Sequence, residues 1–308
     1  MYYGFAFPNT AYAKLWTGVG IAELAWQGCS YLGDSLRADP LTMVAIAAAL
    51  AAGLLAKQWR GRAVAVGLGL YLAYVVRVGG DFMSGRFLTP PFMVAVCLLV
   101  QWPCETRPAV RALPFAVVCI IAMLWPSSLL AAAGRTVLDT TIPPSGIADE
   151  RAQYYHLTGL LRPAGAWTAP RTPHWDLVDR MRASGQRVAV RDMVGFFGYA
   201  ARDDIHVIDS LGLGDPLLAR LPAELGWRIG HFYRRLPDGY VDSLKSGTNV
   251  IADPHLAHYY AQLRTITRAP IWQKARLLTI VRMSLGMYEQ DRVAYTRNLG
   301  GTRASRQP

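Results

Sequence analysis

The chain has 308 residues, of which 52% are apolar and only 17% are charged, and its mean hydropathy is positive at +0.18. That charge fraction is low for a wholly soluble protein. The formal net charge of +11 points to anionic partners such as lipid headgroups, phosphate or acidic glycans, and no nucleic-acid recognition motif accompanies it.

The first 38 residues predict an outer-face loop followed by an interfacial helix. The start of the chain has neither a charged n-region nor an apolar h-region, so it does not read as a signal peptide. Apolar residues recur at helical spacing over 11–37, and Trp16, Trp26 and Tyr31 suit a membrane interface. One amphipathic helix lying flat on a bilayer is expected over this range.

Residues 39–134 are predicted to form a transmembrane region of about four helices. Asp39 and Pro40 supply an N-cap and a first-turn proline for the first of them. Three of the apolar runs are shorter than the roughly 20 residues a span requires, but flanking residues extend them. The runs are Leu41–Leu55, Ala63–Val76, Phe92–Trp102 and Leu113–Ala133.

Basic residues set the expected orientation of these spans. The loops after the first and third spans are cytoplasmic by the positive-inside rule, because they carry Lys57, Arg60, Arg62, Arg107 and Arg111. The N-terminal helix, the loop after the second span and everything beyond residue 134 then lie on the outer side.

The loop at residues 77–91 carries the strongest chemical signal. Asp81 and Arg86 are each too costly to place in hydrocarbon, so the loop must lie at the membrane surface or line a polar cavity. Its glycines permit tight turns and close approach to a bound group. The pattern suits an anionic lipid headgroup, while an ordinary ion pair closing a turn remains the structural alternative.

Beyond residue 134 the pattern changes. Residues 135–174 are predicted as a linker, 175–298 as a small extracytoplasmic α/β domain, and 299–308 as a disordered tail. Strands are expected at 187–190, 205–208 and 249–252, and helices at 175–184, from Asp215-Pro216, at 254–263 and at 271–288. The last of these helices is basic and amphipathic.

Two further patterns in this half give only weak evidence of a binding site. Gly195 and Gly198 follow a predicted strand, but the full nucleotide fingerprint is absent, so a turn is the better interpretation. His255 and His258 stand three apart on a helix without an identifiable third ligand. No metal site is predicted.

Two motifs resemble the multi-pass glycosyltransferases of the GT-C type, in particular the terminal arabinofuranosyltransferases and related flagellar-motor control proteins. They are Tyr2-Tyr3-Gly4 with Pro8-Asn9-Thr10-Ala11-Tyr12-Ala13-Lys14, and Gly79-Gly80-Asp81-Phe82-Met83-Ser84-Gly85-Arg86-Phe87-Leu88. The stretches 195–222 and 227–231 are also similar to the C-terminal domain of that group. Family members are about twice as long, so the chain resembles the C-terminal half, without the outer loop that usually carries the catalytic carboxylate.

The resemblance implies a chemistry. A polyprenyl-phosphate sugar is the donor, with arabinofuranose one candidate sugar, and a cell-envelope glycan hydroxyl is the acceptor. The growing charge on the leaving phosphate needs a cation; Arg86 is expected first in that role and Lys14 second. Asp81 would orient Arg86 or contact the sugar and is a weak general base, while Tyr2, Tyr3 and Asn9 would line the sugar pocket.

The resemblance implies a bacterial inner-membrane location with the C-terminal domain outside the cytoplasm. No cofactor is expected; related enzymes can use a divalent cation, but no residue here demands one. The alternative is a non-catalytic membrane protein whose outer domain binds a glycan or a partner and affects motility or envelope assembly.

Overall fold

The computed structural model describes residues 4–15, 17–101, 141–150, 173–192, 194–224 and 226–304, and the isolated residues 116, 120, 123, 124 and 154; side chains are described as far as residue 299. Most of the predicted fourth span, most of the linker, Tyr2, Tyr3 and residues 305–308 lie outside them. The chain divides into two compact units. The helical unit comprises Val19–Pro170 and Arg228–Gly230, and the α/β unit comprises Met1–Gly18, Arg171–Trp227 and His231–Pro308.

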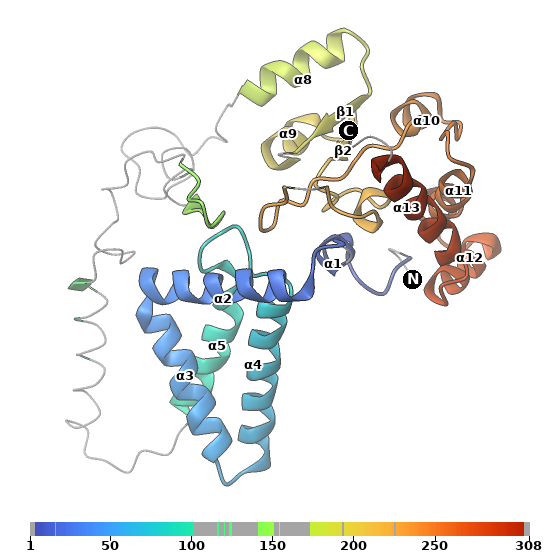
Figure 1. Ribbon diagram of the computed structural model, residues 1–308. Coiled ribbons are helices and arrows are strands. Elements are labelled where there is room, and N and C mark those ends of the chain that lie inside the picture. The colour runs from blue at the N-terminus through green and yellow to red at the C-terminus, as the bar shows by residue number, and fades with distance from the viewer. Residues whose placement is uncertain are drawn as a thin grey trace. The chain divides into compact units, whose positions relative to one another are not determined.

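The helical unit is built from α2 (Ile21–Ala38), α3 (Pro40–Leu55), α4 (Trp59–Arg77), the short 3₁₀ helix η1 (Arg86–Leu88) and α5 (Thr89–Val100). Helix α3 packs against α4 and α5, and α2 crosses the ends of α3 and α4 (Figure 1). The crossing is close because Gly28 of α2 has no side chain. A Cβ there would lie 2.4 Å from the Val76 carbonyl oxygen of α4.

The junction of α2 and α3 is a sharp bend of 113°. The Asp39 side chain accepts a hydrogen bond from the Thr42 amide, with Pro40 in the first turn, which confirms the predicted cap. No single helix among the described residues has both the length and the apolarity of a membrane span, although α2 and α3 meet that test as a bent pair.

The single helix predicted over residues 11–37 is wrong. The structure has two helices, α1 (Asn9–Leu15) and α2, separated by residues 16–20. Gly18 has a φ of +77°, a left-handed conformation that an α-helix cannot accommodate. The apolar residues keep their helical spacing on both sides of Gly18, so the spacing alone could not show that the helix is interrupted there.

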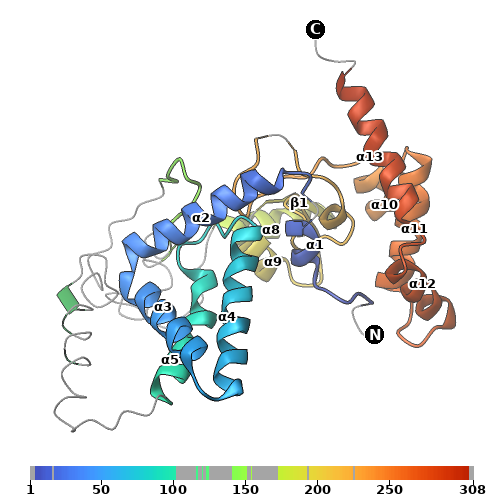
Figure 2. The ribbon, with the colours of Figure 1, turned by 60° about the horizontal axis from the view of Figure 1, so that its bottom comes forward.

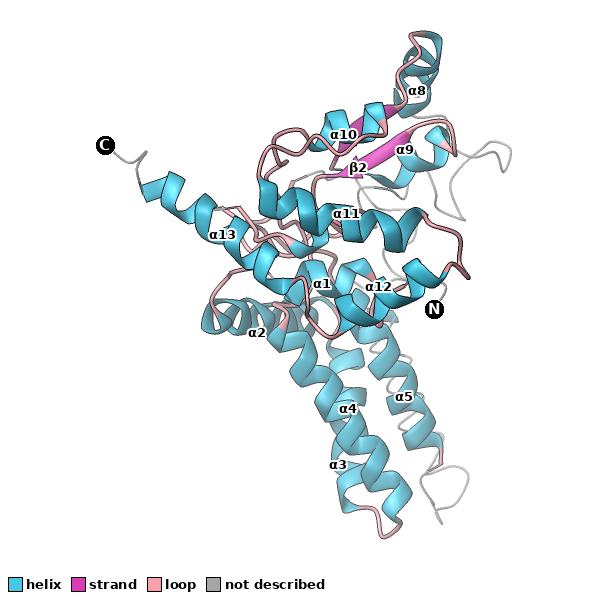
Figure 3. Ribbon diagram, turned by 90° about the vertical axis from the view of Figure 1, so that its right-hand side faces the viewer, coloured by secondary structure: helices cyan, strands magenta, loops and turns pink. Residues whose placement is uncertain are grey.

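The α/β unit contains a two-stranded parallel sheet, seen in magenta in Figure 3. Strand β1 (Val188–Arg191) pairs with β2 (His206–Asp209), with Val188 opposite His206 and Arg191 opposite Asp209. Helix α9 (Val194–Ala201) connects the strands, and α8 (Pro173–Ala183) packs against α9. Both strands lie one residue beyond their predicted positions.

The remaining elements are η2 (Leu218–Arg220), α10 (Tyr240–Ser246), α11 (Pro254–Arg268), α12 (Lys274–Ser284) and α13 (Glu289–Ala304). Helix α11 begins as predicted, with the Asp253 side chain capping the Leu256 amide. The predicted helix at 271–288 ends early because Gly286 has a φ of +75°. Residues 299–304, predicted as part of the tail, continue α13.

Two further predictions in this unit are wrong. Residues 249–252 form no strand; the Asn249 side chain instead donates to the Ala257 carbonyl at 2.7 Å and holds the segment against α11. The helix expected from Asp215 is reduced to the 3₁₀ turn η2, although the Asp215 carboxylate does cap the amides of Leu217 and Leu218.

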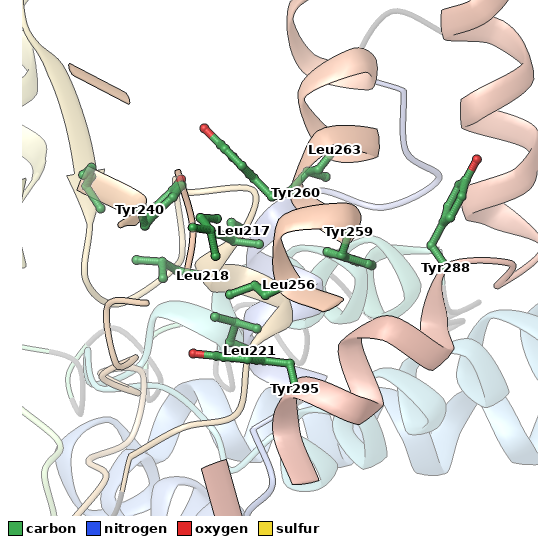
Figure 4. Packing of buried hydrophobic residues seen from close by; sticks show 12 residues of the cluster. Leu217, Leu218, Leu221, Tyr240, Leu256, Tyr259, Tyr260, Leu263, Tyr288 and Tyr295 are labelled. Carbon is green, nitrogen blue, oxygen red and sulfur yellow. The ribbon is translucent and has the colours of Figure 1, made fainter. Parts of the chain in front are cut away.

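The main core of the α/β unit lies between η2, α10 and α11. Leucines around η2 pack beside Leu256 and Leu263 of α11, as Figure 4 shows. Tyrosine rings complete the core, with the ring of Tyr240 edge-on to that of Tyr260. A second cluster, around Val178 and Phe197, fills the space between α8, α9 and the sheet.

Candidate functional site

The Gly79–Arg86 loop is shaped by its close contact with α2. Gly79 and Gly80 adopt φ values of +83° and +72°, which favour glycine. A Cβ on Gly80 would lie 2.5 Å from the Cβ of Tyr31, so α2 also excludes a side chain there on steric grounds. The two glycines are therefore required for the loop to pack directly against α2.

Tyr31 of α2 holds the second half of the loop in place through its hydroxyl group. Its hydroxyl donates to the Met83 carbonyl at 3.2 Å and accepts from the Phe87 amide at 3.1 Å. Burial raises the pKa of Tyr31 above its usual range, so it stays neutral and keeps both bonds. Nearby, the Ser84 hydroxyl donates to the Asp34 carboxylate at 2.8 Å.

Asp81 and Arg86 form an ion pair within this loop. The Arg86 Nε lies 2.6 Å from Asp81 Oδ2. The Asp81 side chain is fully buried, whereas that of Arg86 is 43% exposed. The guanidinium also lies near the rings of Phe82 and Phe87, at 5.1 and 5.6 Å. Asp81 therefore fixes the position of the arginine, whose side chain stays partly exposed.

Two segments remote in sequence complete the loop's surroundings. Residues 145–150 run parallel to it through a bridge between Met83 and Ala148, with the Ala148 amide donating to the Phe82 carbonyl at 2.7 Å. Residues 228–230 pack from another side, because a Cβ on Gly230 would lie 2.5 Å from the Phe82 ring. The loop is thus enclosed by three parts of the chain.

These segments bring two charged residues that the sequence did not single out. Glu150, two residues after the bridged Ala148, is close enough to Arg86 and Arg228 for their charges to act on it. Burial raises the pKa of the Glu150 carboxyl, and the positive charges of Arg228 and Arg86 partly oppose that effect. Arg228 lies across Gly146, whose Cβ would be 2.9 Å from its Cγ. We call Asp81, Arg86, Glu150 and Arg228 the arginine cluster.

The other predicted site residues lie in the α/β unit. Asn9 begins α1, and its side-chain oxygen accepts from Arg220 Nη1 at 3.1 Å. Arg220 is buried between the rings of Phe5 and Tyr12, each 4.1 Å from the guanidinium carbon. Lys14 is 8% exposed. Asn9 thus has a structural contact, and the predicted substrate contacts of both residues stay predictions.

The weaker candidates have structural roles. Gly195 and Gly198 lie inside α9 rather than in a turn, so that interpretation was wrong. His255 and His258 both contact the Asp291 carboxylate, through their Nδ1 atoms at 3.3 and 2.7 Å. Among the described residues no group of three or more His, Cys, Asp or Glu could hold a metal ion.

Comparison with known proteins gives one informative relative. The chain is 31% identical to the terminal β-(1→2)-arabinofuranosyltransferase of Mycobacterium tuberculosis over 224 aligned residues. The chain is distantly related to a glycosyltransferase. The alignment covers 56% of this chain and 35% of the relative, so the chain spans about a third of that enzyme's length. No family model and no solved structure matches.

The arginine cluster contains groups that could contact an anion. The Arg86 side chain is partly exposed and pairs with the buried Asp81 carboxylate, and the charges of Arg86 and Arg228 both act on Glu150.

Proposed function

We propose that the chain is part of an integral-membrane glycosyltransferase of the GT-C type. It moves a sugar, with arabinofuranose the leading candidate, from a polyprenyl-phosphate donor to a cell-envelope glycan on the outer side of the bacterial inner membrane. The relationship to an arabinofuranosyltransferase supports the reaction class, and the partly exposed Arg86 side chain, paired with the buried Asp81, is the observation that supports the site.

Exposed apolar side chains support the membrane part of the proposal. Helices α3 and α5 are almost wholly apolar, and with α4 they present large hydrophobic side chains outward, as expected where lipid covers a helix surface. Those exposed most include Val44, Leu54, Leu55, Val66, Leu70 and Met93.

In this proposal Arg86 binds the donor phosphate and stabilises the charge that grows on it as the bond from the anomeric carbon breaks. Asp81 is a positioning residue, because a fully buried carboxylate cannot reach an acceptor hydroxyl in this conformation. Glu150, which is only partly buried and whose pKa is raised, is better suited to accept the hydroxyl proton.

The experiment compares binding of undecaprenyl phosphate to the wild type and to Arg86→Ala. Loss of a charge-assisted bond should weaken binding by about tenfold or more. Arg37→Ala, which removes an exposed arginine at the end of α2, is the matched control and should bind normally. Sugar transfer from a polyprenyl-phosphate donor is measured in parallel. If Arg86→Ala binds undecaprenyl phosphate as well as the wild type does, Arg86 does not bind the donor phosphate. That result would favour the alternative, a non-catalytic protein that binds a partner.

A further inference from the structure

Helix α12 is fixed firmly on its inner side. Arg276 is buried, and its guanidinium donates from Nε to the Ile266 carbonyl at 2.8 Å and from Nη1 to the Ile271 carbonyl at 3.1 Å. These bonds join α12 to the end of α11 and to the turn between the two helices, which follow one another in Figure 3. The opposite side of α12 is therefore held in one orientation.

That opposite side is apolar and exposed. Leu278, Val281 and Leu285 follow at intervals of three and four residues, so they share one face at the end of α12. Trp272 and Met287 flank them, and Trp272 is 77% exposed. Large apolar residues are ordinarily exposed singly, and a row of this kind marks an interaction surface.

The charge around this face has one sign. Lys274 and Arg282 lie on α12 itself and are exposed. No Asp or Glu occurs between Asp253 and Glu289 in the sequence. An apolar face with a tryptophan at one end and basic residues along its border is typical of a helix that lies in the headgroup region of an anionic membrane.

We propose that the outer face of α12, from Ile271 to Met287, docks on the surface of an anionic phospholipid bilayer. Leu278, Val281 and Leu285 enter the boundary with the acyl chains, Trp272 lies at headgroup level, and Lys274 and Arg282 bind lipid phosphates. The positive border selects an anionic lipid surface over a second copy of the chain, whose identical border would repel it. This docking goes beyond sugar transfer and does not rest on it.

Hydroxyl-radical footprinting of the full chain tests the proposal. The protein is placed in nanodiscs of phosphatidylcholine alone or of phosphatidylcholine mixed with phosphatidylglycerol, and the oxidation rates of Trp272 and Met287 are compared. Docking should lower both rates by about threefold or more when the anionic lipid is present. Tyr199, an exposed residue on α9, is the internal reference and should oxidise equally in both.

A charge-reversal pair makes the test specific. The double variant K274E/R282E should lose the effect of the anionic lipid, while R180E/K245E changes the net charge by the same amount at other exposed positions and should keep it. An unchanged Tyr199 rate shows that the variants are folded. The proposal is overturned if both residues oxidise equally in the two lipids, or if K274E/R282E keeps the effect of the anionic lipid. It is also overturned if the protection grows with protein concentration, as contact with a second copy would cause.

Discussion

Asp215 is a buried acid whose protonation is linked to folding. Burial raises the pKa of its carboxyl to about 6, although the amides of Leu218 and Leu217 and the Tyr240 hydroxyl hydrogen-bond to it and act in the opposite direction. Because the pKa is higher in the folded chain than in the unfolded one, the protonated form favours folding. That stabilisation is complete below the unfolded pKa and is lost as the pH rises through about 6.

The variant Asp215→Asn should remove this pH dependence. Between about pH 4 and about pH 7 the wild type should lose up to ~3 kcal/mol of unfolding free energy through this group, and the variant should not. Urea denaturation of both proteins at the two pH values measures the difference. If the two proteins show the same pH dependence, Asp215 does not titrate as its burial requires.

At the scale of single residues, the sequence predicted part of the candidate site. Asp81 and Arg86 were found because charge is costly between apolar runs, and their ion pair, the structural alternative, is present. Glu150 and Arg228 were missed because only long-range pairing brings them to the loop. The motif at 227–231 was a signal for Arg228, but nothing local distinguished Glu150.

At the scale of elements, helix α11 depends on its N-cap residue, Asp253. Asp253 Oδ1 accepts from the Leu256 amide at 2.9 Å and Oδ2 accepts from the Asn298 side chain at 3.3 Å. Asp253→Ala should lower the unfolding free energy by about 1 kcal/mol, whereas Asp253→Asn, which can still cap, should cost less. Chemical denaturation followed by circular dichroism checks this. Asp242→Ala, at an exposed acid that caps no helix start, serves as the control and should show almost no change.

Helix starts that are set by a local capping residue could be predicted from the sequence. Helix ends that depend on a left-handed glycine, and segments that depend on distant contacts, could not. The Asp-Pro pairs at 39–40 and 253–254 marked helix starts correctly because capping is local. Gly18 and Gly286 ended helices that apolar spacing alone would have continued. The segment 249–252 has a strand-like composition but packs on α11 without pairing.

At the scale of the whole molecule, the α/β unit is assembled from both ends of the chain. Arg234 Nη2 donates to the Ala13 carbonyl at 2.6 Å, and the Ala223 amide donates to the Thr17 carbonyl at 2.7 Å. Arg220 is held by Phe5 and Tyr12. The sequence placed residues 1–38 with the membrane and did not predict this closure, because no local pattern encodes it.

Deleting residues 1–18 should therefore destabilise the α/β unit, although its strands and long helices lie beyond residue 170. The deletion removes one hydrogen bond from each of two buried arginines, Arg220 and Arg234, and a bond to a charged group contributes about 1.5–3 kcal/mol. Limited proteolysis should cut residues 173–304 much faster in the shortened chain. Removing residues 305–308 instead is the control, and equal cleavage in all three chains would contradict the interpretation.

The pairing of Arg86 with Asp81 has a consequence for the proposed reaction. An arginine whose charge is already balanced needs no ligand to be stable, so the loop keeps its shape in the resting state. Any anion that binds Arg86 must share its guanidinium with the Asp81 carboxylate, which belongs to the same loop. In the proposed reaction, this competition would weaken the hold on the phosphate and so favour release of the spent lipid carrier.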